Sequence, residues 1–160
     1  MDPATEALLA EVQARFPCVS KPEGLNLSFH RDDCSLCTYL RRDLARFSDP
    51  VLPREALREI FCEMSCLSAA AWRWALPSYL KHCLTMEDPW GDDETEFLIF
   101  NLGPDPEYQA DTIERLACLD AGQVACLIHF LAWCRAHPYW GEIWQDDIDR
   151  ALEFMRGLQR

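Results

Sequence analysis

The sequence predicts an all-α protein with six or seven helices, folded as a single domain over residues 1–160. Apolar residues recur at helical spacing in several segments, and no segment shows the strict apolar–polar alternation that is typical of strands. Nearly half of the residues are apolar, which is too many for a disordered chain. A chain of 160 residues is also long enough to bury one core.

Two helices with N-terminal caps are expected in the first 50 residues. Residues 2–16 begin with Asp2 as N-cap and a proline at the first helical position, and their apolar side chains share one face. Asp32 or Asp33 is expected to cap a second helix that runs to about Phe47. The prolines that follow end this helix.

Two more helices are expected before the middle of the chain. Pro53 suits the first turn of a short helix that ends near Cys62. Ser68 is a suitable N-cap for a longer helix that contains Pro77. Since proline lacks an N–H donor and crowds the preceding turn, we expect Pro77 to kink or divide this helix.

The negative charge is concentrated in the second half of the chain. The net charge is −12, and ten acidic residues but no lysine or arginine lie between Lys81 and Arg115. Such a surface repels the phosphates of nucleic acids and anionic membranes, so we expect neither as a partner. A basic protein is the natural complement. The alternative is that the charge only keeps the protein soluble.

Residues 86–111 are expected to form a long acidic connector, because prolines and glycines are grouped there with the acids. Within it, only residues 96–100 resemble an ordered element, either a short helix or a strand. After the connector, Asp120 and Gln123 resemble a capping box that opens a strong helix. A last helix is expected over roughly 142–158.

Aromatic residues interrupt the acids in two places, and together they suggest a protein-binding surface. Charge supplies long-range attraction, while exposed aromatic side chains supply short-range anchoring. The candidate partner-binding residues are Trp90, Asp92, Asp93, Glu94, Glu96, Trp140 and Trp144. The two groups of residues would form one surface if the fold brings them together. The alternative is that the aromatic side chains close the edge of the core.

The nine cysteines are expected to be free thiols in a cytosolic protein. The N-terminal residues lack the basic and unbroken apolar regions of a signal peptide. The longest uncharged apolar stretch, residues 121–134, is too short to cross a bilayer.

A zinc site is the first candidate for chemistry. Cys34 and Cys37 have the C-x-x-C spacing that lets two thiolates bind one ion. His30 lies four residues upstream, and Cys62 or Cys66 could complete a tetrahedral set. Alternatively, the thiols are apolar core residues or a redox pair. A redox pair is disfavoured because no βαβ context is visible and the acids at residues 32–33 oppose thiolate formation.

No catalytic motif is present, so we expect the protein not to be an enzyme. The sequence contains no G-x-S-x-G, H-E-x-x-H, Walker or G-x-G-x-x-G pattern. His82 and Cys83 are adjacent, but consecutive residues on a helix point about 100° apart. They therefore cannot act as a dyad with each other.

Two segments carry a family pattern: CLSAAAWRWALPSYL at residues 66–80 and LDAGQVACLIHFLAWC at residues 119–134. The matching residues are Leu67, Ser68, Trp72, Leu76, Pro77, Tyr79, Leu80, Leu119, Gln123, Leu127, Phe130 and Leu131. The chain thereby resembles a family of small uncharacterised bacterial helical proteins, some of which carry a His/Cys-rich motif upstream. The resemblance implies a helical fold and a bacterial origin, and no established activity.

The sequence therefore favours a non-catalytic binding protein, monomeric or dimeric. The most concrete hypothesis is an immunity protein that occludes the active site of a cognate bacterial toxin, since toxins that attack nucleic acids or nucleotides are basic. The alternative is a regulatory or adaptor module stabilised by zinc at Cys34 and Cys37. A thiol-dependent enzyme is the third hypothesis.

Overall fold

The computed structural model describes residues 1–31 and 33–159, and in this part of the chain it contains nine α-helices and four 3-10 helices. Apart from an isolated bridge between Ser28 and Leu67, these residues contain no β-structure. The α-helices are α1 (Pro3–Arg15), α2 (Ser35–Asp43), α3 (Arg54–Ile60), α4 (Ala69–Thr85), α5 (Asp93–Leu102), α6 (Gln109–Leu116), α7 (Ala121–Ala136), α8 (Pro138–Ile143) and α9 (Gln145–Leu158). The 3-10 helices are η1 (Gly24–Leu27), η2 (Phe61–Cys66), η3 (Pro89–Gly91) and η4 (Pro106–Tyr108). The predicted all-α class is confirmed.

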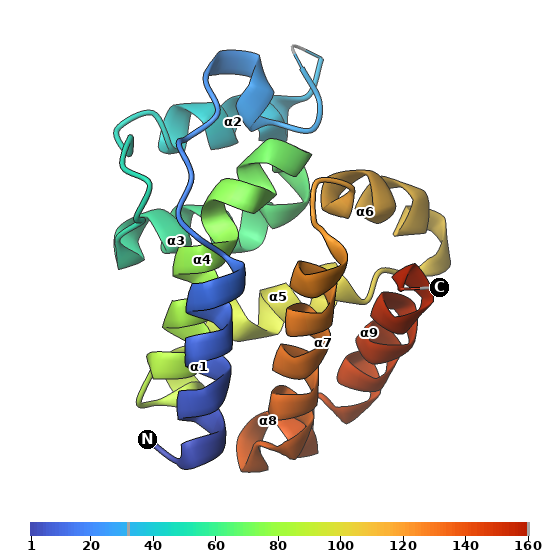
Figure 1. The fold of residues 1–160 in the computed structure, drawn as a ribbon. Helices are drawn as coiled ribbons and strands as arrows, with labels where there is room; N and C mark the ends of the chain where they lie inside the picture. The colour runs from blue at the N-terminus through green and yellow to red at the C-terminus, as the bar shows by residue number, and fades with distance from the viewer. Residues whose placement is uncertain (32, 160) are drawn as a thin grey trace.

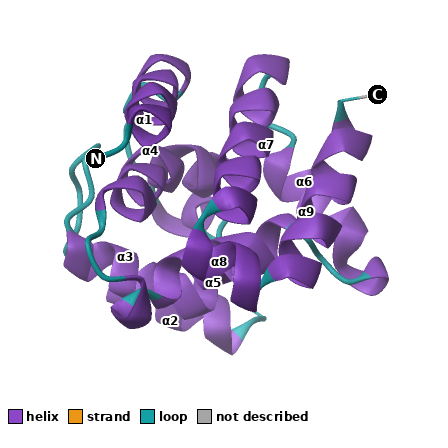
Figure 2. Ribbon diagram, turned by 90° about the horizontal axis from the view of Figure 1, so that it is seen from below, coloured by secondary structure: helices purple, strands orange, loops and turns teal. Residues whose placement is uncertain are grey.

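Helix α7 packs between α1 and α9, and α4 packs against α1, α3, α5 and α6 (Figure 1). Figure 1 also shows α2 at one end of the molecule and α8 at the other. The second view shows α1 packed beside both α4 and α7, although α2 and α3 separate α1 from α4 in the sequence, and α5 and α6 separate α4 from α7 (Figure 2). This arrangement brings the start of α5 close to the C-terminal part of α4.

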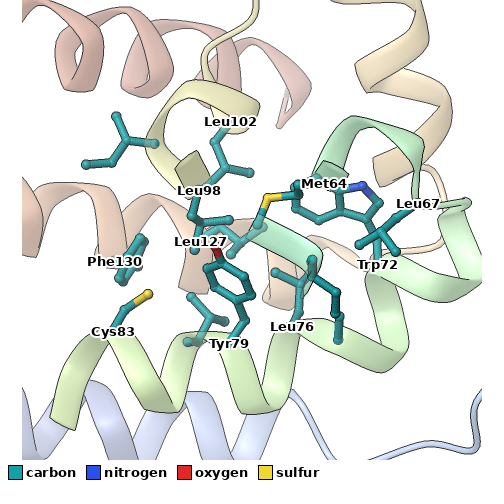
Figure 3. Close-up of a cluster of buried hydrophobic side chains, with 14 of the residues drawn as sticks. Met64, Leu67, Trp72, Leu76, Tyr79, Cys83, Leu98, Leu102, Leu127 and Phe130 are labelled. Atoms are coloured by element: carbon teal, nitrogen blue, oxygen red, sulfur yellow. The ribbon is translucent and has the colours of Figure 1, made fainter. Parts of the chain in front are cut away.

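The centre of the core lies between α4, α5 and α7 (Figure 3). Trp72 and Tyr79 of α4 are almost completely buried, as are Leu98 of α5 and both Leu127 and Phe130 of α7. Burial of one such apolar side chain contributes about 1.5–3 kcal/mol. Helix packing, rather than intrinsic helix propensity, therefore holds α5 in place, although it begins in a strongly acidic segment.

Three predicted helix starts are confirmed by their hydrogen bonds. The carboxylate of Asp2 accepts hydrogen bonds from the first backbone N–H groups of α1, and the Ser68 hydroxyl accepts one from Ala71. Asp120 and Gln123 form the complete capping box at the start of α7. Each such cap is worth about 1 kcal/mol.

The start of the second helix differs from the prediction. Cys34, not Asp33, is the N-cap of α2, and no side chain caps this helix. Asp32, the other predicted cap, lies outside the described residues. Pro77 does not divide α4, which is continuous from Ala69 to Thr85.

The acidic segment is more ordered than expected. Most of residues 86–111 belong to η3, α5, η4 and the start of α6, and the expected ordered element at 96–100 is the central part of the ten-residue helix α5. The expected last helix corresponds to α9, which begins three residues later than predicted, at Gln145; Ile143, expected on its buried side, ends α8 instead and is 48% exposed.

Candidate functional site

Two aromatic pairs join the acidic segments that lie far apart in the sequence. The ring centroids of Trp90 and Tyr139 are 4.9 Å apart in an edge-to-face arrangement. Those of Phe100 and Trp144 are 5.2 Å apart in the same arrangement, which is a favourable one for aromatic rings. The segment from η3 to α5 therefore meets α8 and the start of α9, and the two predicted groups form one surface.

The helices that follow Trp90 and Trp144 also carry carboxylates in their first turns. Asp93 and Glu96 are in the first turn of α5, and Asp147 is in the first turn of α9. Burial, together with repulsion from Asp93 and Asp147, raises the pKa of Glu96 above its ordinary value, so the three carboxylates share one electrostatic environment. We call the surface formed by Trp90, Asp93, Glu96, Tyr139, Trp144 and Asp147 the acidic-aromatic face.

Trp90 is the most exposed part of this face. Its residue surface is 77% accessible, whereas Glu96 and Trp144 are half-buried. Large exposed aromatic residues of this kind are enriched among the anchors of protein interfaces. The side chain of Asp93 is also 56% exposed, although it lies 3.5 Å from Arg58 in a surface ion pair.

Three of the predicted binding residues lie elsewhere. Asp92 is 4% exposed, Glu94 is fully buried and Trp140 is 1% exposed. The expectation that they belong to an exposed surface is therefore wrong. Trp140 packs into the core, while the two carboxylates turn from the start of α5 toward His82 of α4.

The inward-facing carboxylates form a polar cluster with His82 and Arg58. The Nε2 atom of His82 lies 3.3 Å from Asp92 Oδ1 and 3.8 Å from Glu94 Oε2. The Nε atom of Arg58 lies 2.8 Å from Glu94 Oε1. We call His82, Asp92 and Glu94 the buried carboxylate cluster. Sequence spacing does not indicate it, because the 3-10 helix η3 separates His82 from the acids and reverses the chain between them.

The two carboxylates of this cluster ionise differently. Burial opposes ionisation of Asp92, but the neighbouring imidazole of His82 and a hydrogen bond from the Thr95 hydroxyl outweigh it and hold the pKa of Asp92 below its ordinary value. Burial and the neighbouring carboxylate of Asp92 raise the pKa of Glu94. Asp92 is therefore the carboxylate that loses its proton first.

The predicted thiol site is also assembled by the fold. One ligand atom from each of His30, Cys34 and Cys37 lies within 4.8 Å of the others. The Sγ atom of Cys37 is 3.8 Å from the Nδ1 atom of His30. We call these three residues the thiol cluster. Zinc commonly binds thiolate and imidazole ligands in such sets, with a fourth ligand completing a tetrahedron.

Backbone hydrogen bonds hold the loop with His30 against η2. The N–H group of Phe29 donates to the Cys66 carbonyl at 2.7 Å, and the N–H group of Ser68 donates to the Leu27 carbonyl at 3.1 Å. Arg41, which lies on α2, donates a hydrogen bond from its guanidinium to the Ser28 hydroxyl. Residues from three separate segments are therefore fixed around the thiol cluster.

The pKa values of the cysteines in this region shift in different directions. A hydrogen bond from the backbone N–H of Cys37 lowers the pKa of Cys34, whereas burial raises the pKa of Cys37. Burial and the neighbouring Cys37 raise the pKa of Cys66 to about 12. The thiol of Cys37 donates to the backbone carbonyl oxygen of Cys66 at 3.9 Å. Cys66 therefore lies beside the thiol cluster, although it is not one of the three converging ligands. It is the candidate for the fourth ligand position.

These features define an all-helical protein with an exposed acidic-aromatic face and two separate clusters of potential metal ligands. The chain belongs to the Family of unknown function (DUF6714), whose model matches residues 8–147. This match confirms the resemblance to an uncharacterised family and spans the acidic-aromatic face and both clusters. No curated protein and no solved structure matches the chain.

Across residues 1–31 and 33–159, no helix combines the length and the apolar character that a membrane span requires.

Proposed function

We propose that the protein is a non-catalytic inhibitor that binds a basic protein partner through the acidic-aromatic face. The observation that carries this proposal is the exposed Trp90, whose ring packs on Tyr139, together with the mutually repelling carboxylates in the first turns of α5 and α9. An exposed aromatic ring provides an anchor that the partner can desolvate, while the carboxylates provide attraction and orientation.

The charge of the molecule supports a partner of opposite charge. The net charge is −12, and the acids of the face are close enough to repel one another. Separated charges at the surface interact over about 8 Å at physiological ionic strength, so clustered carboxylates act together on an approaching basic surface. Such complementarity raises the association rate and excludes acidic partners.

The most concrete form of this function is immunity against a cognate bacterial toxin. A toxin that cleaves nucleic acid or nucleotides needs a basic active site, and an acidic protein can occlude it. The neighbouring gene is the first place to look for this partner. A gene for a secreted toxin or a basic enzyme at that position would support the immunity proposal, and its absence together with empty pull-downs would remove it.

Charge reversal on the face is expected to slow association. In the variant Asp93→Lys/Glu96→Lys, the association rate with the captured partner should fall about tenfold at low salt, and the difference should shrink as salt increases. Stopped-flow or surface plasmon resonance measurements at several salt concentrations check this result. The Arg58–Asp93 pair is exposed, so its loss should change the free energy of unfolding by less than about 1 kcal/mol.

The matched control is Glu23→Lys/Glu114→Lys, which changes the net charge by the same amount. Both control residues are exposed and lie outside the acidic-aromatic face; Glu114 is on α6, near the end of the molecule opposite α8 (Figure 1). An equal loss of rate in both double variants would mean that the overall charge, not the face, drives association.

A second candidate function is a zinc-stabilised regulatory or adaptor module. Its support is the convergence of His30, Cys34 and Cys37, with ligand atoms within 4.8 Å of one another. A zinc ion there would connect the loop before α2 to the helix itself and stabilise the fold by binding only the native state.

Loss of one thiolate is expected to remove the zinc of this cluster. Metal analysis of the purified protein should show about one equivalent less zinc in Cys34→Ser than in the wild-type chain. Cys18→Ser is the control, because Cys18 is exposed and does not belong to the cluster. Equal zinc contents of the wild-type chain and Cys34→Ser would exclude a zinc site at these residues.

A further inference from the structure

The buried carboxylate cluster has an unusual charge balance for the interior of a protein. Asp92 is 4% exposed and Glu94 is completely buried. The charged groups that lie near them are Asp93, Arg58 and His82. Two buried carboxylates therefore lie near one guanidinium, and Arg58 also pairs with the exposed carboxylate of Asp93. A buried charge is costly unless a partner balances it, so the cluster calls for additional positive charge.

Helix capping does not account for the position of Asp92. It is the N-cap of α5, where an aspartate normally accepts a hydrogen bond from a backbone N–H of the first turn. Here the side chain makes no such bond. One carboxylate oxygen accepts a hydrogen bond from the Thr95 hydroxyl, and the other, Oδ1, points toward His82.

Several buried polar atoms of the cluster lack a hydrogen bond. They are His82 Nε2, Asp92 Oδ1 and both carboxylate oxygens of Glu94. Arg58 Nε approaches Glu94 Oε1 at 2.8 Å as an ion pair, so the oxygen that remains is Oε2, on the side of His82. Buried atoms of this kind normally have partners. The three remaining atoms come from different residues and face one another.

The spacing of these atoms suits one metal ion. One ligand atom from each of His82, Asp92 and Glu94 lies within 4.8 Å of the others, and Nε2 of His82 lies 3.3 Å from Asp92 Oδ1 and 3.8 Å from Glu94 Oε2. Ligands at about 2.0–2.2 Å from a tetrahedral zinc ion are separated by roughly 3–4 Å. Small side-chain shifts would therefore place all three atoms in coordination distance.

A solvent path to the cluster is present. A pocket of about 450 Å³ is lined by His82 and Asp92, and also by the exposed side chains of Arg54, Glu87 and Asp88. The acids that line the pocket outnumber its one arginine and so favour cations, and the pocket leaves room for a water molecule as a fourth ligand.

We propose that His82, Asp92 and Glu94 bind a divalent transition-metal ion of the zinc class. One imidazole nitrogen and two carboxylate oxygens form a borderline ligand set that suits zinc better than magnesium or calcium, which prefer oxygen alone. The ion balances the excess of carboxylates and ties the start of α5 to α4. It thereby holds Asp93 and Glu96 in place on the acidic-aromatic face.

The experiment uses the full chain with the thiol cluster disabled by His30→Ala/Cys34→Ser, which leaves the buried Cys37 intact. After removal of metal with a chelator, the protein is titrated with Co²⁺ and then with Zn²⁺. We expect one equivalent of Co²⁺ to bind with visible d–d absorption and without a thiolate charge-transfer band, and Zn²⁺ to displace it. Zn²⁺ should also raise the melting temperature by several degrees.

Added to that background, Asp92→Asn or His82→Ala should weaken Co²⁺ binding at least tenfold, because each removes one ligand. The matched control is His129→Ala, which removes an exposed histidine that lies beside Glu11 and outside the cluster. Circular dichroism checks that each variant is folded, and the nearly isosteric Asp92→Asn decides the result if His82→Ala unfolds.

Binding of less than about a tenth of an equivalent to the folded background chain would overturn the proposal and assign the charge balance to a protonated His82. A thiolate charge-transfer band, or Co²⁺ binding that is unchanged in Asp92→Asn, would also overturn it. These results are independent of partner binding, so the proposal can fail while the inhibitor function stands.

Discussion

Replacement of Gly141 by alanine is expected to be among the most destabilising single changes in the chain. Gly141 lies in α8, which folds back against the end of α7, and an added Cβ would collide with the backbone carbonyl of Arg135. Because the backbone cannot move aside as a flexible side chain can, we expect a loss of about 3 kcal/mol or more in the free energy of unfolding. Chemical denaturation monitored by circular dichroism measures this loss.

Gly157→Ala provides the matched control. Gly157 lies near the end of α9, and a Cβ there would meet nothing within 4 Å. This substitution should stabilise the protein by up to about 1 kcal/mol, since alanine favours the helix and has less freedom when unfolded. If Gly141→Ala were as stable as Gly157→Ala, the close packing of α8 on α7 would be incorrect, and with it the position of Tyr139.

Trp90→Ala is expected to have the largest effect on partner binding. The ring is 77% exposed, so its removal should change the free energy of unfolding little. As the central anchor of the acidic-aromatic face, however, it should contribute about 2 kcal/mol to binding, which corresponds to an approximately 30-fold higher dissociation constant. Isothermal titration calorimetry with the captured partner checks this value.

Tyr39→Ala is the control for the loss of an exposed aromatic side chain. Tyr39 is 46% exposed and lies on α2, at the end of the molecule opposite α8 (Figure 1). Its removal should leave the dissociation constant unchanged. A larger effect at Tyr39 than at Trp90 would place the binding surface on α2.

Features that depend on neighbouring residues could be predicted from the sequence. The caps formed by Asp2, Ser68 and Asp120 act on N–H groups within three residues, and each is found at its predicted helix start. The C-x-x-C spacing likewise indicated the thiol cluster, because its two thiols are one helical turn apart.

Features that depend on tertiary packing were missed. Prolines and glycines made the acidic segment resemble a connector, but the burial of Leu98, Ile99 and Leu102 holds it as helix α5. The same packing turns Asp92 and Glu94 inward, whereas their charge predicted exposure. Helical spacing does place Glu94, four residues before Leu98, on the buried side of α5, but the sequence did not predict that this helix begins as early as Asp93.

The meeting of the two acidic-aromatic segments also required the fold. Trp90 and Tyr139 are in contact only because α7 and α8 bring the second segment back to η3. The sequence indicated both halves of the surface, because Tyr139, Trp144 and Asp147 belong to its second group of aromatic and acidic residues. Whether the two groups meet could not be decided from the sequence, since the contact depends on the path of the chain between them.

Hydrogen–deuterium exchange of the complex tests the central claim most directly. The acidic-aromatic face predicts that partner binding slows exchange in residues 89–97 and 138–147, since the interface covers η3, the start of α5, α8 and the start of α9. Exchange in α2 and α6 should stay as it is in the free protein. Protection confined to α2 or α6, with residues 89–97 and 138–147 unchanged, would contradict the account.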